Sequence, residues 1–324
     1  LRNFTYQHKS LMKQSVQEHI VVCLKGLAMG AADLVPGVSG GTIALITHIY
    51  ERLIRAIDGV TVELVSQLFG TKRKEAWKAL DGSFLLPLVL GIATSILLLS
   101  GLIEWLLHSY PIPLWAFFFG LILASAFVLK SSVTKWNITA LAAMAIGFFV
   151  AFGIGLVTPN TGSESLLYLF LCGVLVVIAM ILPGISGAFI LILLGTYETA
   201  LDALDKLKHF ELEGLVVFLV MAAGGVVGLK AFAKILRWLF TQHKNIVLAA
   251  MTGFLLGSLY KVWPWKKVTS YYTNSDGLAE PLTTTAVLPE LSNPDAQVLL
   301  AFVAFIAALC LLYFLEKFST KSHG

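Results

Sequence analysis

Charged residues are scarce in this sequence: Asp, Glu, Lys and Arg make up 13% of the 324 residues, whereas 57% are hydrophobic. Soluble domains average roughly a quarter charged residues, so the mean hydropathy of +0.84 indicates a chain whose solvent is lipid. The three cysteines, Cys23, Cys172 and Cys310, lie far apart in apolar runs, which argues against a zinc knuckle or a disulfide framework. The segment GTIALIT lacks the lysine of a nucleotide-binding P-loop. We expect no metal, no cofactor and no nucleic-acid partner.

Long apolar segments dominate the remainder. Two of them, 16–50 and 166–198, are as long as spanning helices but are interrupted midway by Pro-Gly and Ser-Gly. A broken helix at membrane depth is tolerated only where protein or a water-filled cavity satisfies its freed backbone groups. The sequence therefore predicts an all-α integral membrane protein with two re-entrant hairpins. Six further windows approach or reach the about 20 apolar residues of a spanning helix, at 84–107, 112–129, 138–157, 214–240, 245–262 and 296–315.

The two interrupted segments are copies of one another. Residues 34–58 align with residues 181–205 at a constant offset of 147, and 9 of the 25 pairs are identical. The helices that follow correspond without gaps at an offset of 133, as Gly91 and Gly224 do. We therefore expect two repeats, each a re-entrant hairpin followed by three transmembrane helices: residues 1–157 with hairpin 16–50, and residues 158–324 with hairpin 166–198.

Lys and Arg in the short loops predict the orientation. The loop 51–82 is basic, whereas the loop 158–165 has no Lys or Arg. If each hairpin enters and leaves on one side, both termini and loop 51–82 are cytoplasmic, and loops 158–165 and 263–295 lie outside. Lys266 and Lys267 are exceptions to this pattern. Because three spans, an odd number, separate the hairpins, we expect inverted repeats in a multi-pass protein of the bacterial inner membrane.

The two breaks have the composition of an anion site. Proline ends the incoming half-helix, glycine permits positive φ and close backbone approach, and Ser or Thr caps the outgoing half-helix. Amides at such a helix N-terminus attract anions, and inverted repeats place the substrate where the interrupted helices meet. The simpler alternative is that the serines only cap a tight turn. The breaks are predicted at Pro36, Gly37, Pro183 and Gly184, and a substrate phosphate is expected at Ser39, Gly40, Gly41, Thr42, Ser186 and Gly187.

Acidic residues within the membrane are functional candidates, because burying one costs about 2.5–3.5 kcal/mol on insertion scales. Asp33 precedes the first break, and its partner in the second copy is Met180. Glu51 and Glu198 stand at equivalent positions after a tyrosine. We expect these three carboxylates to bind a coupling H⁺ or Na⁺, and for the two glutamates an interfacial anchor is an equal alternative.

Four basic residues are candidates for contacting the phosphate. Arg52 and Arg55 share a helix face and can bind a phosphate in bidentate fashion, or they are ordinary positive-inside anchors. Lys230 lies about 15 Å from a helix end near residue 241, at about 1.5 Å per residue, which is deep for a snorkelling lysine. Lys25 is placed similarly before the first hairpin.

Two other functional classes fit parts of this pattern. An intramembrane serine hydrolase fits the form GxSG around Ser39 and Ser186, but a nucleophilic serine needs an adjacent general base. His48 has Gly195 as its counterpart in the second copy, and a duplicated site favours a carrier over one active centre. We therefore expect a transporter and no enzyme. A transporter or channel for a small soluble anion is the remaining alternative.

The segments GLAMGAADLVPGVSGGTIALI (26–46) and CGVLVVIAMILPGISGAFILILLGTYE (172–198) share the doubled motif PG[VI]SG. In this motif, and over nearly the whole chain, the sequence resembles the bacterial polyprenyl-phosphate transporter family of PopT type, first catalogued as a membrane domain of unknown function. The resemblance implies a flippase that returns undecaprenyl phosphate, the lipid carrier of cell-wall precursors, from the outer to the inner leaflet by alternating access, driven by an ion gradient. The expected partners are this anionic lipid, membrane lipids and further copies of the chain.

Overall fold

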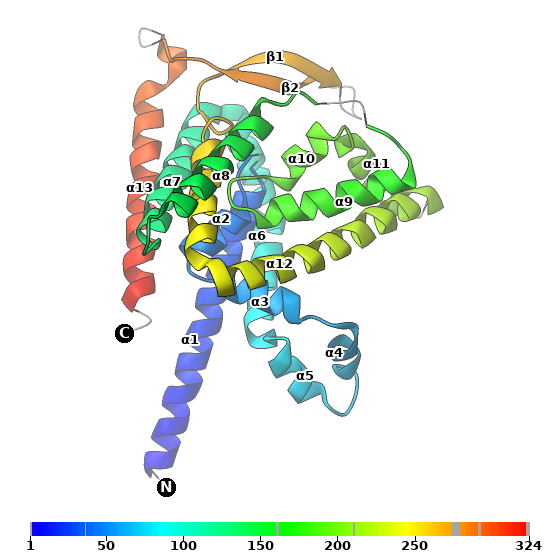
Figure 1. Ribbon diagram of the computed structural model, residues 1–324, viewed down its shortest axis with the longest axis vertical. Helices are drawn as coiled ribbons and strands as arrows, with labels where there is room; N and C mark the ends of the chain where they lie inside the picture. The colour runs from blue at the N-terminus through cyan, green and yellow to red at the C-terminus, as the bar shows by residue number, and fades with distance from the viewer. Residues whose placement is uncertain are drawn as a thin grey trace.

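The computed structural model describes residues 2–35, 37–159, 162–209, 211–273, 279–290 and 293–321, and these residues are mostly helical (Figure 1). The first half of the chain contains α1 (Arg2–Asp33), α2 (Gly40–Ile46), α3 (Tyr50–Gly59), α4 (Val62–Gln67), α5 (Arg73–Ala79), α6 (Gly82–Ser109), α7 (Pro111–Ser131) and α8 (Ile138–Leu156). The second half contains α9 (Leu166–Ile181), α10 (Gly187–Leu193), α11 (Tyr197–Lys208), α12 (Leu212–Ser258), β1 (Lys266–Thr273), β2 (Ala279–Ala286), the 3₁₀ turn η1 (Pro294–Ala296) and α13 (Val298–Lys321).

Four helices of the described chain, α6, α7, α8 and α12, are long and apolar enough to cross a membrane. The pair α10 and α11, bent by 112°, makes a fifth if it counts as one broken span. Large apolar side chains such as Leu97 and Leu98 are exposed on α6, as lipid-facing residues are. The chain is thus a multi-pass membrane protein, as the hydropathy predicted.

The structure differs from the predicted elements in the long loop. The stretch labelled α12 consists of two helices joined by a kink at His243, where φ is −136° and ψ is 42°, and this residue lies between the windows 214–240 and 245–262. The loop expected at 263–295 contains an antiparallel pair, β1 with β2, so the chain is not purely α-helical. The β-branched and aromatic residues of these strands favour extended backbone. In Figure 1 this pair lies at the end of the molecule opposite both chain termini.

Helix packing repeats between the two halves. A Cβ atom at Gly26 of α1 would collide with the carbonyl oxygen of Leu88 in α6, and one at Gly173 of α9 would collide with that of Met221 in α12. These two contacts are related by the offsets of 147 and 133 that the sequence shows. Small residues let membrane helices approach closely, so α1 packs on α6 in the way that α9 packs on the first part of α12.

The last helices of the two halves pack in a crossed arrangement. Gly120 of α7 faces Phe305 of α13, and Gly253 in the second part of α12 faces Met144 of α8. Gly120 and Gly253 are again related by the offset of 133. Each half therefore places its last helix against the second transmembrane helix of the other half. All residues of α2 are buried.

Candidate functional site

The two hairpin breaks adopt the same backbone geometry. Gly37 has a φ of +87° and Gly184 a φ of +85°, a left-handed conformation that glycine adopts without steric cost. Pro183 follows the end of α9, and Pro36 lies outside the described residues. Each break leads into a short helix, α2 or α10, with a serine at its N-cap position, where the sequence places the anion site.

The tips of the two hairpins are bonded to each other. The Ser39 hydroxyl donates a hydrogen bond of 3.0 Å to the carbonyl oxygen of Met180, and it accepts one of 3.1 Å from the amide of Gly41. The Thr42 hydroxyl oxygen accepts a hydrogen bond of 3.1 Å from the Gly184 amide. Both hydroxyl groups belong to buried residues. The structure thus brings the predicted tip residues together, with their hydroxyl groups engaged inside the protein.

A carboxylate of the chain itself occupies the start of α2. Asp33 Oδ1 accepts a hydrogen bond of 2.6 Å from the Gly40 amide, which is one of the free amides expected to bind phosphate. At the start of α10 the side chain of Met180 takes the position that Asp33 has at the start of α2. Its Cγ atom lies 2.5 Å from where a Cβ atom on Gly187 would stand. The Ser186 side chain makes no capping hydrogen bond. In this conformation a phosphate reaches the Gly40 amide only by displacing Asp33.

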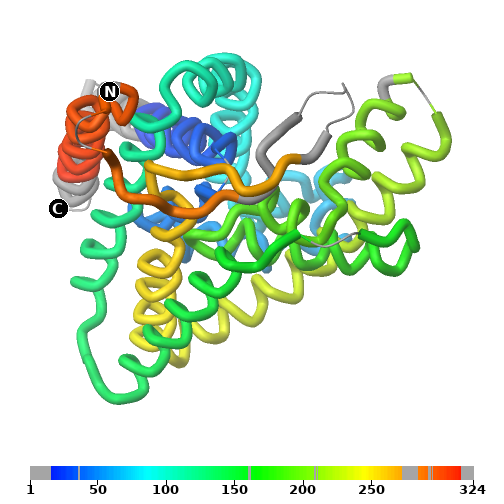
Figure 2. Tube along the Cα trace, turned by 90° about the horizontal axis from the view of Figure 1, so that it is seen from above, coloured from blue at the N-terminus to red at the C-terminus, as the bar shows by residue number. Residues whose placement is uncertain are grey.

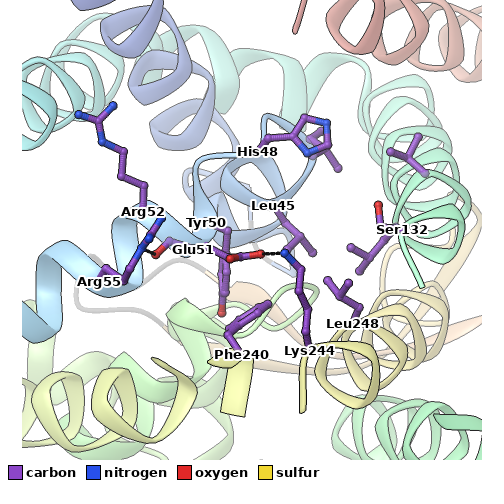
Figure 3. A pocket seen from close by; sticks show the side chains of 13 residues that line it. Leu45, His48, Tyr50, Glu51, Arg52, Arg55, Ser132, Phe240, Lys244 and Leu248 are labelled. Atoms are coloured by element: carbon purple, nitrogen blue, oxygen red, sulfur yellow. Dashed lines mark hydrogen bonds and ion pairs between the residues drawn. The ribbon is translucent and has the colours of Figure 1, made fainter. Parts of the chain in front are cut away.

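A basic cavity of about 340 Å³ opens at the exit of the first hairpin, between α2, α3, α7 and α12 (Figure 3). It contains the predicted Arg52 and Arg55 and also Lys244, which follows the kink of α12. Apolar side chains form its other walls, so a phosphate ester with a short stretch of hydrocarbon fits its chemistry. The cavity is lined by Leu45, Ile46, His48, Tyr50, Glu51, Arg52, Arg55, Val128, Leu129, Ser132, Phe240, Lys244 and Leu248.

Three carboxylates pair with the basic side chains of this cavity, and the longest of these pairs joins Glu18 to Arg52 at 3.6 Å. Lys244 forms an ion pair of 2.5 Å with Glu51, and Figure 3 shows the two side chains meeting across the cavity. Arg52 donates hydrogen bonds of 2.6 and 2.8 Å to Asp81, with its guanidinium group over the Phe84 ring. Arg55 Nε reaches the backbone carbonyl of Glu51 at 3.3 Å. An entering anion competes with these pairs.

Two lysines predicted to contact phosphate bind helix ends instead in this conformation. Lys230 Nζ donates to the carbonyl oxygens of Ile57, Asp58 and Val60 at 3.2, 2.6 and 2.5 Å, which uses its three donors. Lys25 Nζ donates to the carbonyl oxygen of Thr47 at 2.8 Å. Lysines at helix C-termini satisfy the unpaired carbonyl groups there. These contacts fasten the ends of α3 and α2.

The three carboxylates expected to bind a coupling ion have different surroundings. Asp33 caps α2, and Glu51 pairs with Lys244. Glu198, the equivalent of Glu51, has one buried carboxylate oxygen, Oε1, without a hydrogen-bond partner in the described part of the chain. The symmetry of the sequence is therefore broken in the contacts of the two glutamates.

Sequence reasoning left out three lysines that the structure places near the hairpins. Lys244 lines the basic cavity. Lys261 lies over the Phe189 ring of α10, and Lys266 over the Trp115 ring of α7. The signal available in the sequence was the presence of Lys266 in a loop expected to face outside.

Two broken-helix hairpins that meet inside a bundle of apolar helices define a class of multi-pass membrane protein. Residues 29–280 match the family described as VCA0040-like, undecaprenyl phosphate translocase-like. This match covers well over half of the chain, which therefore belongs to that family. No solved structure matches the chain.

Two curated relatives are similar to the chain. A protein of Vibrio cholerae serotype O1, named polyprenyl-phosphate transporter, is 40% identical over 314 residues, which cover 96% of this chain and 100% of the relative. A protein of Staphylococcus aureus with the same name is 34% identical over 253 residues, which cover 74% of this chain and 85% of the relative. The predicted family is thus confirmed.

Proposed function

We propose that this chain transports polyprenyl phosphate and returns undecaprenyl phosphate from the outer to the inner leaflet of the bacterial inner membrane. The family and the names of both relatives support this class of substrate. The observation that carries the proposal is the direct contact between two broken-helix tips beside a basic cavity. The phosphate crosses along the hairpins while the prenyl tail remains in lipid, so only the headgroup passes through the costly region.

We propose that residues 1–157 and 158–324 are inverted repeats, with both termini in the cytoplasm. The repeated contacts of Gly26 with Leu88 and of Gly173 with Met221 support this relation. The crossed packing of α13 on α7 and of α8 on α12 also supports it, because a two-fold axis in the membrane plane exchanges such pairs.

Alternating access follows from this arrangement. The basic cavity lies at the mouth of the first hairpin, which the positive-inside pattern assigns to the cytoplasm. Opening a path from the other side requires the Ser39–Met180 and Thr42–Gly184 hydrogen bonds to break. A phosphate at the tips then replaces Asp33 at the Gly40 amide, and a phosphate in the cavity replaces Glu51 at Lys244. Each step exchanges one anion for another.

A coupling cation, H⁺ or Na⁺, fits the same mechanism. Moving one net charge against 100 mV costs about 2.3 kcal/mol, and the substrate is anionic. Asp33, once displaced by phosphate, needs a new partner, and Glu198 Oε1 has none in the described residues. We propose that these two carboxylates carry the cation, while Glu51 neutralises Lys244 when the cavity is empty.

The test uses vesicles that contain undecaprenyl phosphate in both leaflets and the purified protein. An impermeant phosphatase added outside hydrolyses only outer-leaflet phosphate, so transport raises the hydrolysed fraction from about half to nearly all. Protein-free vesicles and protein-containing vesicles without added phosphatase are the controls. A fraction that stays at about half contradicts the proposal. Uptake of inorganic phosphate by the same vesicles would instead favour a soluble-anion transporter.

A further inference from the structure

Two lysines between the end of α12 and the start of β1 lie against aromatic rings near the first hairpin break. Lys261 Nζ lies 3.9 Å from the centroid of the Phe189 ring, and Lys266 Nζ lies 3.3 Å from that of Trp115. Lys261 Cγ is 3.3 Å from where a Cβ atom on Gly37 would stand. Both side chains are therefore drawn in from the end of the molecule that the proposed topology places outside, against aromatic faces next to the first hairpin break.

Neither ammonium group has a hydrogen bond or ion pair with any residue that the structure describes. Other buried or half-buried basic groups do have partners: Lys230 binds backbone carbonyls, and Arg52 binds Asp81. Desolvation lowers the pKa of Lys261 to about 8. Desolvation also lowers the pKa of Lys266 well below its usual value, and the neighbouring charge of Lys261 adds to this effect. Keeping these desolvated groups charged is costly without a counterion, and a nearby anion offsets that cost.

We infer that Lys261 and Lys266 form the outward-facing binding site for the phosphate monoester headgroup of the lipid substrate, separate from the cytoplasmic basic cavity. This inference rests on the proposed function. The separation follows from α12, which rises from Lys244 to Ser258 by roughly 21 Å at about 1.5 Å per residue. The hairpin tips lie along this path, because Gly37 contacts Lys261 and Glu51 contacts Lys244.

Ammonium groups on aromatic faces keep part of their attraction in the empty site and exchange it for a stronger charge-assisted bond when phosphate enters. Lysine suits this purpose, since it binds phosphate as a compact point charge. The neighbouring Lys267 provides a matched control because its side chain is exposed and has no such ring contact. If these lysines served only as interfacial anchors, replacing them would not affect phosphate binding selectively.

The experiment compares binding of farnesyl phosphate, farnesol and inorganic phosphate to the purified protein in lipid nanodiscs. We expect Lys261→Gln and Lys266→Gln each to weaken farnesyl phosphate binding about tenfold or more, the loss of one hydrogen bond to a charged group. Farnesol binding and the thermal midpoint should change little, and Lys267→Gln should match wild type in every measurement. Lys266→Arg should restore part of the affinity.

A second readout is protection of the lysines from an impermeant amine reagent, followed by mass spectrometry. Farnesyl phosphate should protect Lys261 and Lys266 but leave Lys267 reactive. The inference is overturned if both glutamine variants bind farnesyl phosphate as wild type does, if farnesol binding falls equally, or if inorganic phosphate binds as tightly as the lipid. These measurements need no transport. Vesicles that fail to translocate undecaprenyl phosphate would refute the proposed function, while the binding comparison still decides the lysine site.

Discussion

Replacing Gly40 by alanine tests how tightly the first hairpin tip is built. A Cβ atom there would stand 2.5 Å from Asp33 Oδ2 and 2.9 Å from the backbone carbonyl oxygen of Met29. The carboxylate would have to retreat by nearly 1 Å to reach ordinary contact, since carbon and oxygen atoms pack at about 3.5 Å. That shift breaks its bond of 2.6 Å with the Gly40 amide.

The magnitude follows from these two effects. Overpacking costs about 1–3 kcal/mol, and losing a hydrogen bond to a charged group costs about 1.5–3 kcal/mol. Because one movement causes both, we expect a total of about 3 kcal/mol, or a fall in thermal midpoint of roughly 6–12 °C at about 2–4 °C per kcal/mol. Gly187→Ala is the matched control, because the nearest neighbours of its Cβ atom would be side chains, the flexible Met180 with Cγ at 2.5 Å and Val176 with Cγ1 at 3.2 Å. Its midpoint should therefore fall less.

The assay is thermal unfolding in lipid nanodiscs, followed by tryptophan fluorescence. Removing the carboxylate should partly rescue the variant: the double variant Gly40→Ala with Asp33→Ala should lose clearly less than the sum of the two single variants, since the closest contact is absent and only the 2.9 Å approach to the Met29 carbonyl oxygen remains. Equal damage from Gly187→Ala, or full additivity of the double variant, would show that the Asp33 contact does not explain the need for glycine.

Three further predictions concern the tips, the coupling ion and the topology. Ser39→Ala, which removes the hydrogen bond to Met180, should slow vesicle transport more than Ser186→Ala, because the latter side chain caps nothing; equal rates in the phosphatase assay would contradict this. Asp33→Asn should abolish accumulation driven by an ion gradient and leave farnesyl phosphate binding within a few-fold of wild type, whereas wild-type accumulation would remove Asp33 from coupling. Impermeant maleimide should label a cysteine at Glu164 from outside intact cells and one at Lys74 only after lysis, and labelling of both from one side would exclude inverted repeats.

The hairpin breaks were predictable because their cause is local. Gly37 and Gly184 occupy positive φ, and the residues around them are those that end one helix and start another. The helix contacts of Gly26 and Gly173 follow equally from the repeat, since one duplicated sequence produces the same crossing twice. Both the local backbone preferences and the duplication can be identified from consecutive residues of the sequence.

The partners of the polar side chains were not predictable from spacing. Ser39 bonds to Met180 over 141 residues, and Lys230 reaches Asp58 over 172. Lys230 was expected to bind phosphate because it lies too deep to reach water easily. The structure shows that it binds the free carbonyl groups at the end of α3 instead. The strands β1 and β2 depend on pairing across the loop.

The asymmetry between the repeats has a physical consequence for the direction of transport. Arg52 and Arg55 stand at the mouth of the first hairpin, and their counterparts Thr199 and Asp202 leave the mouth of the second hairpin without arginine. If only the repeats supplied charge, an anionic headgroup would bind at the mouth of the first hairpin and find no site at the mouth of the second. The segment after α12 adds Lys261 and Lys266 near the first hairpin break, on the side that the proposed topology places outside. These two lysines have no carboxylate partners in the described chain. At the other mouth, Arg52 is already paired with Asp81 and Lys244 with Glu51. In the topology and direction proposed above, capture at the two lysines needs no anion to be displaced, whereas at the basic cavity Glu51 and Asp81 compete with the phosphate, which would favour its release.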